Sequence, residues 1–294
     1  MATISVAVPR KGRPLEAVLE RLAARTGEQA LADDVISTLR YEKAITKGTQ
    51  ETETPIYERL AAYSDSDDPH APEYTLLRDS RAGLPRRVVF DSLTVPVGDH
   101  DLRLVGREEP FRALRKHEFA LGFDSADLVL EEVVALDPDP LSDIGAVNGR
   151  IDPRDTDVRV VNGLGDTVYH TLLATPAVVD GDLDRSFVEG YAGPLCVSPR
   201  YERLVEAVLG TRATEDVSFC YPAASETEEE AIADAGVGVY VTVTGSTARD
   251  HGLVLGERLF PSETVLLENR RELTSAEAGL KEAFSPVETE LTVR

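Results

Sequence analysis

The 294-residue sequence carries 31 basic and 53 acidic side chains, which give a formal net charge of −22, and 42% of its residues are hydrophobic. The hydrophobic share is normal for a globular protein and argues against wholesale disorder. The negative charge excludes nucleic acid and anionic membranes as partners, because both need a basic surface. Asp and Glu are spread along the whole chain, a pattern typical of halophilic proteins, whose self-repulsion is screened at high salt.

The length is sufficient for two lobes, each with its own core. We expect a cytoplasmic protein, because the start of the chain lacks the apolar run of a signal peptide and no stretch approaches membrane-spanning length. The two cysteines, Cys196 and Cys220, have no Cys or His neighbours at metal-ligand spacing and are predicted to be buried structural residues. The five histidines show no metal-like spacing either, so no protein-bound metal is predicted.

The N-terminal segment predicts a strand, a turn and a helix. Residues 4–8 are an apolar strand pattern, residues 9–12 form a turn, and Pro14 opens a helix whose apolar residues recur at helical spacing until Gly27. This strand–loop–helix unit is a building block of α/β folds. The polar stretch 43–75 instead predicts an insertion or a long loop.

The remaining chain alternates between strands and helices. We predict strands at residues 86–90, 102–105, 119–123, 158–161, 217–221 and 237–243. We predict helices at residues 110–116, from the N-cap Ser125 to Asp137, from Ser198-Pro199 to Gly210, and at residues 226–234. The loop from Asp137 to about residue 156 is interpreted as the first crossing between the lobes.

Three basic residues, Arg10, Lys11 and Arg13, occupy the loop between the first strand and its helix. In an open α/β sheet this loop lies at the carboxyl end of a strand, where ligands bind, and the N–H groups of a helix N-terminus attract anions. The sequence therefore predicts an anion site at Lys11, Gly12 and Arg13. A solvated basic turn explains the same residues equally well.

The stretch 103–116 contains several cations, among them Arg107, Arg112 and Arg115. They form either a second anion-binding patch or, on a helix, solvent-facing partners of the nearby glutamates. The second interpretation is favoured for most of them.

The turn Thr244-Gly245-Ser246-Thr247 follows a β-branched strand. Small hydroxyl residues beside a glycine let the backbone approach a phosphate or a ribose. The turn lacks the lysine of a P-loop, and a simple capped turn is the favoured alternative.

Four segments occur in an order that matches one enzyme family. They are Lys11-Gly12-Arg13 after the first strand, Arg107 to Pro110, residues 118–129, and Thr244-Gly245-x-Thr247 with the later Gly252-Leu253 and Asn269. A fifth segment, residues 197–210, lies between the third and the last and matches a strand, proline and helix of the second lobe. Together they resemble the catalytic part of the ATP phosphoribosyltransferases, the first enzymes of histidine biosynthesis. The resemblance spans most of the chain, and its last segment is the most specific.

The resemblance implies an α/β, two-lobed fold like that of type II periplasmic binding proteins, with two crossings between the lobes and the ligand in the cleft. Lobe I would comprise residues 1–140 and 245–294, and lobe II residues 141–244. The implied reaction displaces pyrophosphate from phosphoribosyl pyrophosphate by the adenine N1 of ATP. Mg²⁺ would enter through the substrate phosphates, and the partners would be small polyanionic substrates. Whether the chain forms a homo-oligomer is open.

The same resemblance implies roles for cations and for a turn. Lys11 and Arg13 would face the cleft and neutralise phosphate charge, and Arg107 would do so from the same lobe. Thr244, Gly245 and Thr247 would line the cleft where the chain recrosses.

The resemblance also implies roles for Asp127, Ser225 and Thr227. Asp127 would hold a hydroxyl or a metal-bound water, or else stabilise a helix start. Ser225 and Thr227 would donate hydrogen bonds to a phosphate, but the adjoining run Glu228 to Glu230 is unfavourable beside an anion. On a helix this run would instead favour the dipole. No residue is identified as a general base, and the catalytic residues are unknown.

Three functions remain open on the sequence alone. The first is a divergent phosphoribosyltransferase. The second is a non-catalytic paralogue, a small-molecule-binding or regulatory protein with the same two-lobed cleft, and the third is a solute-binding module without a nucleotide. The glutamate run separates the first two, because an enzyme needs free backbone N–H groups for phosphate and a paralogue does not.

Overall fold

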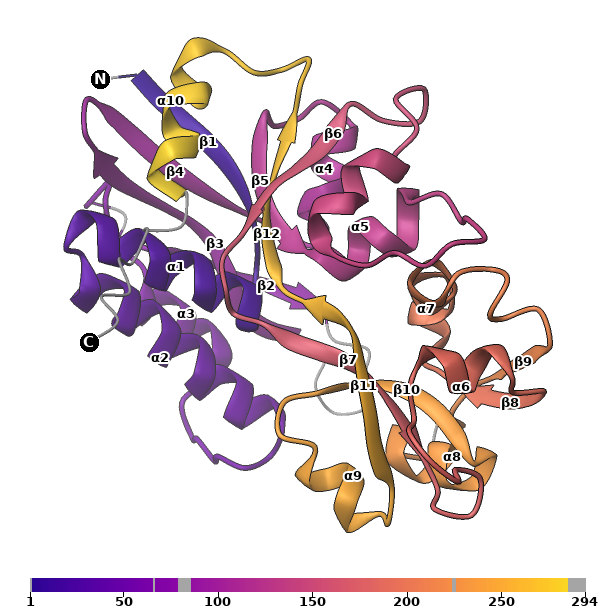
Figure 1. The fold of residues 1–294 in the computed structure, drawn as a ribbon. Coiled ribbons are helices and arrows are strands. Elements are labelled where there is room, and N and C mark those ends of the chain that lie inside the picture. The colour runs from indigo at the N-terminus through magenta and orange to yellow at the C-terminus, as the bar shows by residue number, and fades with distance from the viewer. Residues whose placement is uncertain (1, 66, 79–85, 224–225, 285–294) are drawn as a thin grey trace, which may run out of the picture. The chain divides into compact units, whose positions relative to one another are not determined.

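The computed structural model describes residues 2–65, 67–78, 86–223 and 226–284 (Figure 1). Its strands are β1 (Ala2–Pro9), β2 (Glu73–Arg78), β3 (Arg86–Val97), β4 (His100–Arg107), β5 (Leu121–Ser125), β6 (Val158–Gly163), β7 (Val168–Ala174), β8 (Gly193–Cys196), β9 (Val217–Cys220), β10 (Val237–Thr242), β11 (Val254–Ser262) and β12 (Thr264–Asn269). Its α-helices are α1 (Arg13–Thr26), α2 (Gln29–Thr46), α3 (Ile56–Tyr63), α4 (Pro110–Arg115), α5 (Ala126–Val133), α6 (Arg185–Glu189), α7 (Glu202–Leu209), α8 (Glu228–Ala235), α9 (Ser246–Asp250) and α10 (Ser275–Phe284). Two 3-10 helices, η1 (Ile144–Arg150) and η2 (Pro199–Tyr201), complete the list. No helix within the described ranges is both long and apolar enough to cross a bilayer.

The chain divides into two compact units. Unit 1 comprises Met1–Asp124, Asp157–Asp166 and Thr264–Arg294, and unit 2 comprises Ser125–Thr156 and Thr167–Glu263.

These units differ from the predicted lobes. Residues 125–140 and 245–263 lie in unit 2, residues 157–166 lie in unit 1, and the chain passes between the units at four places instead of two. The reason is packing that the local sequence does not show. In unit 2, α5 packs on α7, where the Glu131 carboxylate accepts a hydrogen bond from the Leu204 N–H at 3.1 Å. In unit 1, β6 pairs with β12.

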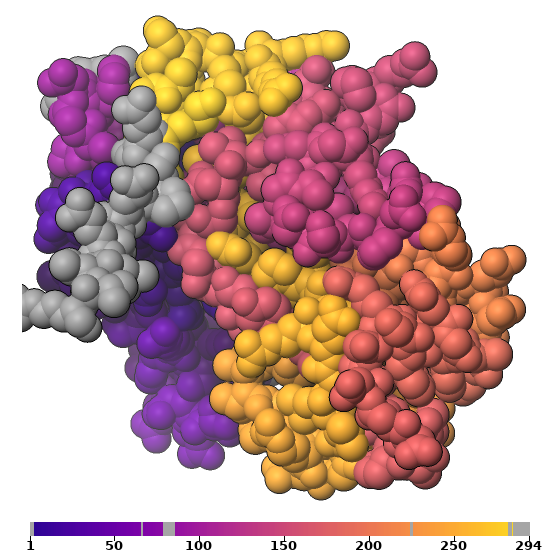
Figure 2. All heavy atoms as spheres, in the orientation of Figure 1, coloured from indigo at the N-terminus to yellow at the C-terminus, as the bar shows by residue number. Residues whose placement is uncertain are grey.

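Unit 1 contains a seven-stranded sheet with the order β2-β3-β4-β1-β5-β12-β6. Strand β1 is parallel to both of its neighbours, β4 and β5. Strands of this kind are covered on both faces and therefore read as continuous apolar runs, and Val6, Ala7 and Val8 are completely buried. Helices α1 and α2 pack together, and α10 packs against α1. In Figure 2 the yellow atoms around α10 form part of the outer surface of this unit.

Unit 2 contains a five-stranded sheet with the order β11-β7-β10-β8-β9. Its strand β8 is parallel to β9 and β10, whereas β7 is antiparallel to β10 and β11. Both units thus place one strand between two parallel neighbours and add a strand that enters from the other unit, β12 in unit 1 and β7 in unit 2. This repeated order is that of the type II periplasmic-binding-protein fold, so the predicted fold class is confirmed.

The elements predicted at the N-terminus and between residues 86 and 243 are present, with ends shifted by a few residues. The prediction of a long loop at residues 43–75 is wrong, because α2 continues to Thr46 and the stretch also contains α3 and the first half of β2. Of the two cysteines, Cys196 is buried as predicted, and Cys220, its partner across β8 and β9, is half-buried. Burial, followed by the nearby Cys220 thiol, raises the pKa of Cys196 to about 12.

A buried ion pair joins α2 to α3. The Arg59 Nε and Nη2 donate to the two Glu42 oxygens at 2.7 and 2.9 Å, and Tyr63 Oη donates to Glu42 Oε1 at 2.9 Å. Glu42 is 2% exposed and Arg59 9%. The hydrogen bond to Glu42 raises the pKa of Arg59, and burial together with Glu42 raises the pKa of Tyr63 to about 12. The buried pair therefore holds α3 where the polar sequence suggested a loop.

We predict that Arg59→Ala lowers the free energy of unfolding by about 3–5 kcal/mol, because it leaves Glu42 buried without its counter-charge. Arg40→Ala is the matched control. It removes the exposed pair between Arg40 and Glu16 and should cost at most about 1 kcal/mol. Urea unfolding at one fixed high salt concentration measures both values, and equal losses for the two variants would contradict the prediction.

Candidate functional site

A pocket of about 570 Å³ lies within unit 1. Its walls come from the turn between β1 and α1, from α2, and from the β2–β3 pair. The lining residues are Lys11, Gly12, Glu16, Leu39, Arg40, Lys43, Thr46, Lys47, Arg78, Arg87, Val88 and Val89. Six of them are cations and one is a carboxylate, an excess of five positive charges in a chain whose net charge is −22.

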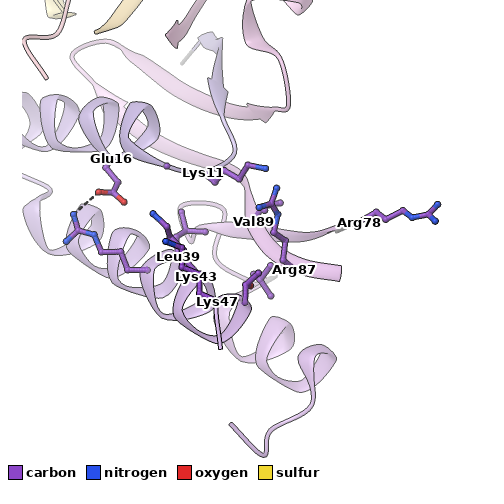
Figure 3. Close-up of a pocket in the computed structure, with 12 residues that line it drawn as sticks. Lys11, Glu16, Leu39, Lys43, Lys47, Arg78, Arg87 and Val89 are labelled. Carbon is purple, nitrogen blue, oxygen red and sulfur yellow. Dashed lines mark hydrogen bonds and ion pairs between the residues drawn. The ribbon is translucent and has the colours of Figure 1, made fainter. Parts of the chain in front are cut away.

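Helix α2 supplies one wall of the pocket. Leu39, Lys43 and Lys47 are spaced four residues apart, so their side chains lie on one face of the helix. Figure 3 shows them facing the pocket with Lys11 from the turn and Arg87 from β3, whereas the Arg78 side chain extends away. Leu39 is buried, and the two lysines are exposed.

The charges of this pocket are unevenly compensated. The Glu16 carboxylate accepts a hydrogen bond from Arg40 Nη2 at 2.7 Å, a bond that raises the pKa of Arg40. Within the described part of the chain, no carboxylate forms an ion pair with Lys11, Lys43 or Lys47. These three ammonium groups therefore remain available to an anion, and their mutual repulsion favours one.

The turn after β1 places Lys11 at the pocket. Gly12 has φ +82°, a left-handed conformation that glycine adopts without strain, and α1 begins directly after it. Arg10 anchors the turn, since its Nε donates to the Gly106 carbonyl at 3.1 Å and its Nη2 lies 3.4 Å from Asp91. Two of the predicted site residues, Lys11 and Gly12, thus line the pocket.

Arg13 and Arg107 are held by other groups of unit 1 and do not line the pocket. Arg13 Nη1 donates to the Asp166 carbonyl and lies 3.2 Å from the Asp166 carboxylate. Arg107 stacks on the Phe119 ring at 4.9 Å and lies 4.0 Å from Glu118. The contact with Glu118 matches the pairing favoured for the cations of residues 103–116.

Asp127 lies inside unit 2, in the first turn of α5. It is 4% exposed, and its carboxylate accepts a hydrogen bond from Ser262 Oγ at 2.8 Å. His170 Nε2 approaches the other oxygen to 3.2 Å, and His170 is 1% exposed. The carboxylate therefore ties α5 to β7 and β11.

The turn of residues 244–247 lies between β10 and α9 in unit 2. Thr244 and Thr247 are exposed, while Gly245 is buried with φ +71°. The left-handed conformation favours glycine here, and a Cβ on Gly245 would lie 2.0 Å from the end of the Leu255 side chain, which would have to move. Arg249 Nη1 donates to the Thr244 carbonyl at 3.0 Å. The two threonines thus remain predicted ligands of a phosphate or ribose.

Thr227 caps helix α8. Its hydroxyl accepts from the Glu230 N–H at 3.3 Å, and the Glu230 carboxylate accepts from the Thr227 N–H at 2.9 Å, which completes a capping box. The hydrogen bond from the Thr227 N–H, followed by that from its hydroxyl, lowers the pKa of Glu230. The glutamate run therefore lies at the positive end of a helix, as the dipole interpretation expected. Ser225, predicted beside it, falls outside the described residues.

The sequence interpretation missed the cations of α2 and of the β2–β3 pair. Arg40, Lys43 and Lys47 recur at helical spacing after the apolar residues of the same helix, which was the available signal. The polar composition of residues 43–75, which predicts a loop, obscures this spacing. Arg87 faces the pocket, and Arg78 lies on its wall, only because β2 pairs with β3, which no local pattern shows.

Comparisons with known proteins identify one family. A family model described as halobacterial ATP phosphoribosyltransferase matches residues 1–294, the whole chain. No curated protein matches the sequence.

Solved structures give more distant likenesses. The chain is similar to the ATP phosphoribosyl transferase (HisG:HisZ) complex from Thermotoga maritima, with 14% identity, a TM-score of 0.42, and 96% of this chain and 98% of that chain covered. It is also similar to the BvgS VFT2 domain of Bordetella pertussis, with 13% identity, a TM-score of 0.39, and 97% and 88% covered. YhfZ from Shigella flexneri gives 10% identity, a TM-score of 0.40, and 97% and 88% covered. At such TM-scores these likenesses assign no function.

We predict that Thr227→Ala lowers the free energy of unfolding by about 1 kcal/mol through loss of the helix cap. It should leave substrate affinity unchanged, because the hydroxyl is engaged by Glu230. Thr227→Ser, which keeps a capping hydroxyl, is the control and should retain stability. Urea unfolding of both variants measures the free energy of unfolding, and titration of both variants with substrate measures the affinity. A large loss of affinity with unchanged stability would instead support a ligand role for Thr227.

Proposed function

Because the chain belongs to the halobacterial ATP phosphoribosyltransferase family, we propose that it transfers the phosphoribosyl group of phosphoribosyl pyrophosphate to ATP. The observation that carries this proposal is the cationic pocket beside the β1–α1 turn of an otherwise acidic chain. The resemblance noted for Lys11-Gly12-Arg13 begins at this turn. Both proposed substrates and the released pyrophosphate are polyanions.

In the proposed reaction, a bond forms between adenine N1 and the ribose C1′, and the bond from C1′ to the pyrophosphate oxygen breaks. The leaving group departs with the electron pair of that bond. Such a transfer requires little covalent chemistry from the protein, and the rate gain comes from positioning and from stabilisation of the developing negative charge. Ammonium and guanidinium groups held in place before the reaction supply that stabilisation.

The pocket provides such groups within unit 1. Lys11, Lys43 and Lys47 have no carboxylate partner in the described ranges, and Arg87 lies on the same pocket. Lys11 is the residue for which the geometry and the family pattern agree. We propose that it contacts a substrate phosphate, while Arg13 and Arg107 support the turn and the adjoining strand through the contacts described above. Thr244, Gly245 and Thr247 are proposed as contacts for a phosphate or ribose in unit 2.

Mg²⁺ is proposed to arrive with the substrate phosphates, whose charge it would neutralise in part. No group of three or more His, Cys, Asp or Glu side chains able to hold a metal occurs among the described residues. Among the described residues that line the pocket, the carboxylate is that of Glu16, which is engaged by Arg40. This donor set suits an ion coordinated through substrate oxygens.

We also propose a cytoplasmic, high-salt setting for the reaction. The net charge of −22 and the halobacterial family support it. At about 1 M salt the Debye length is about 3 Å. Repulsion between the acidic surface and an anionic substrate is therefore suppressed, whereas contacts inside the pocket persist.

One observation favours the second candidate, a non-catalytic paralogue that acts as a small-molecule-binding or regulatory protein with the same two-lobed cleft. The capping box of Thr227 and Glu230 occupies the N-terminus of α8, where a phosphate-binding loop was expected. If this were the family's phosphate loop, the chain would bind ATP without turnover. Binding of ATP in the absence of product formation would identify this candidate.

We predict that the protein forms phosphoribosyl-ATP and pyrophosphate from the two substrates with Mg²⁺ at high salt. Lys11→Ala should lower kcat/KM by about tenfold to hundredfold, the value of one hydrogen bond to a charged group. Arg25→Ala is the control. It removes one positive charge from an exposed position at the opposite end of α1 and should leave kcat/KM unchanged. Chromatographic product analysis gives the rates, and absence of product from a folded parent protein would refute the proposal.

A further inference from the structure

The row of cations on α2 extends along the pocket and does not converge on one point. Lys43 and Lys47 are four residues apart on one helix face, which separates their attachment points by about 6 Å along the axis. Lys11 and Arg87 contribute charge from two other elements. A single phosphate reaches one or two of these groups, whereas an elongated polyphosphate can contact several together.

The pocket also has an apolar side. Leu39 from α2 and Val88 and Val89 from β3 line it, and each is less than 10% exposed. Its volume of about 570 Å³ lies within the range of about 300–1,000 Å³ that is typical of small-molecule sites. A ligand with a polyanionic chain and an apolar ring system matches both surfaces.

Helix α2 holds its lysines on a rigid base. Glu42, directly before Lys43, is fixed by the buried pair with Arg59, and Thr46, directly before Lys47, is also buried. The backbone that carries Lys43 and Lys47 is therefore held in place. Because long-range attraction is screened at high salt, several direct contacts are needed there to hold an anion.

We propose that Lys43 and Lys47 bind the triphosphate chain of the nucleotide and make affinity depend on the number of phosphates. The identification of the ligand as a nucleoside triphosphate rests on the proposed function. The preference for a longer polyphosphate rests on the pocket alone. It should therefore hold in unit 1 without phosphoribosyl pyrophosphate and without turnover.

The test is calorimetric titration of the full chain with inorganic phosphate, pyrophosphate and tripolyphosphate at one fixed salt concentration. We expect affinity to rise in that order. The double variant Lys43→Ala/Lys47→Ala should bind tripolyphosphate at least tenfold more weakly and lose most of the preference over phosphate. Because alanine favours helix formation, α2 should remain folded, and unchanged urea unfolding would establish this.

The matched control is Arg25→Ala/Arg212→Ala, which removes two exposed positive charges outside the pocket. It should leave tripolyphosphate affinity within about twofold of the parent. Equal weakening in the two double variants would show a general charge effect and overturn the proposal, as would equal affinity of the parent for all three anions.

The outcome is separable from that of the proposed function. A protein that yields no product but loses tripolyphosphate binding in Lys43→Ala/Lys47→Ala would refute the transferase activity and support the polyphosphate site. A protein that forms product with unchanged KM for ATP in that variant would refute the polyphosphate site alone.

Discussion

The parallel pairing of β1 with β4 and β5 is the constraint on which the pocket of unit 1 depends. It buries β1 and brings the end of β1 beside Gly106 of β4. A Cβ on Gly106 would lie 3.0 Å from Arg10 Cγ and 2.6 Å from the Phe90 carbonyl, so glycine lets the Arg10 side chain cross β4. Arg10 then anchors the turn, Gly12 reverses the chain, and Lys11 is left at the pocket.

The second constraint is the buried pair of Glu42 and Arg59. It fixes the backbone of α2 at Glu42, while Lys43 and Lys47 line the pocket. Like charges at this spacing destabilise a helix slightly, and high salt reduces that cost. The C-terminal half of α2 therefore combines a buried ion pair with lysines that have no ion-pair partner among the described residues.

The charge around the pocket of unit 1 is opposite in sign to the net charge of the chain. An excess of five positive charges around one pocket, in a molecule of net charge −22, attracts polyanions to that pocket while the rest of the surface repels them. In unit 2, by contrast, two carboxylates make hydrogen bonds within the protein. There Asp127, which the resemblance placed beside a hydroxyl or a metal-bound water, accepts a hydrogen bond from Ser262, and Glu230 completes the helix cap with Thr227.

Local sequence alone determined β1, the left-handed turn at Gly12, the start of α1 and the alternation of strands and helices, since each follows from hydrophobic spacing or from Pro and Gly within about ten residues. Tertiary structure decided the rest. Helix α3 is held by the ion pair between Arg59 and Glu42 of α2. Arg87 lines the pocket because β3 pairs with β2 and β4. The Asp127 carboxylate is buried because it accepts a hydrogen bond from Ser262, a residue 135 positions later in the sequence. Contacts between residues so distant in sequence leave no periodic trace in either segment, so only the folded chain reveals them.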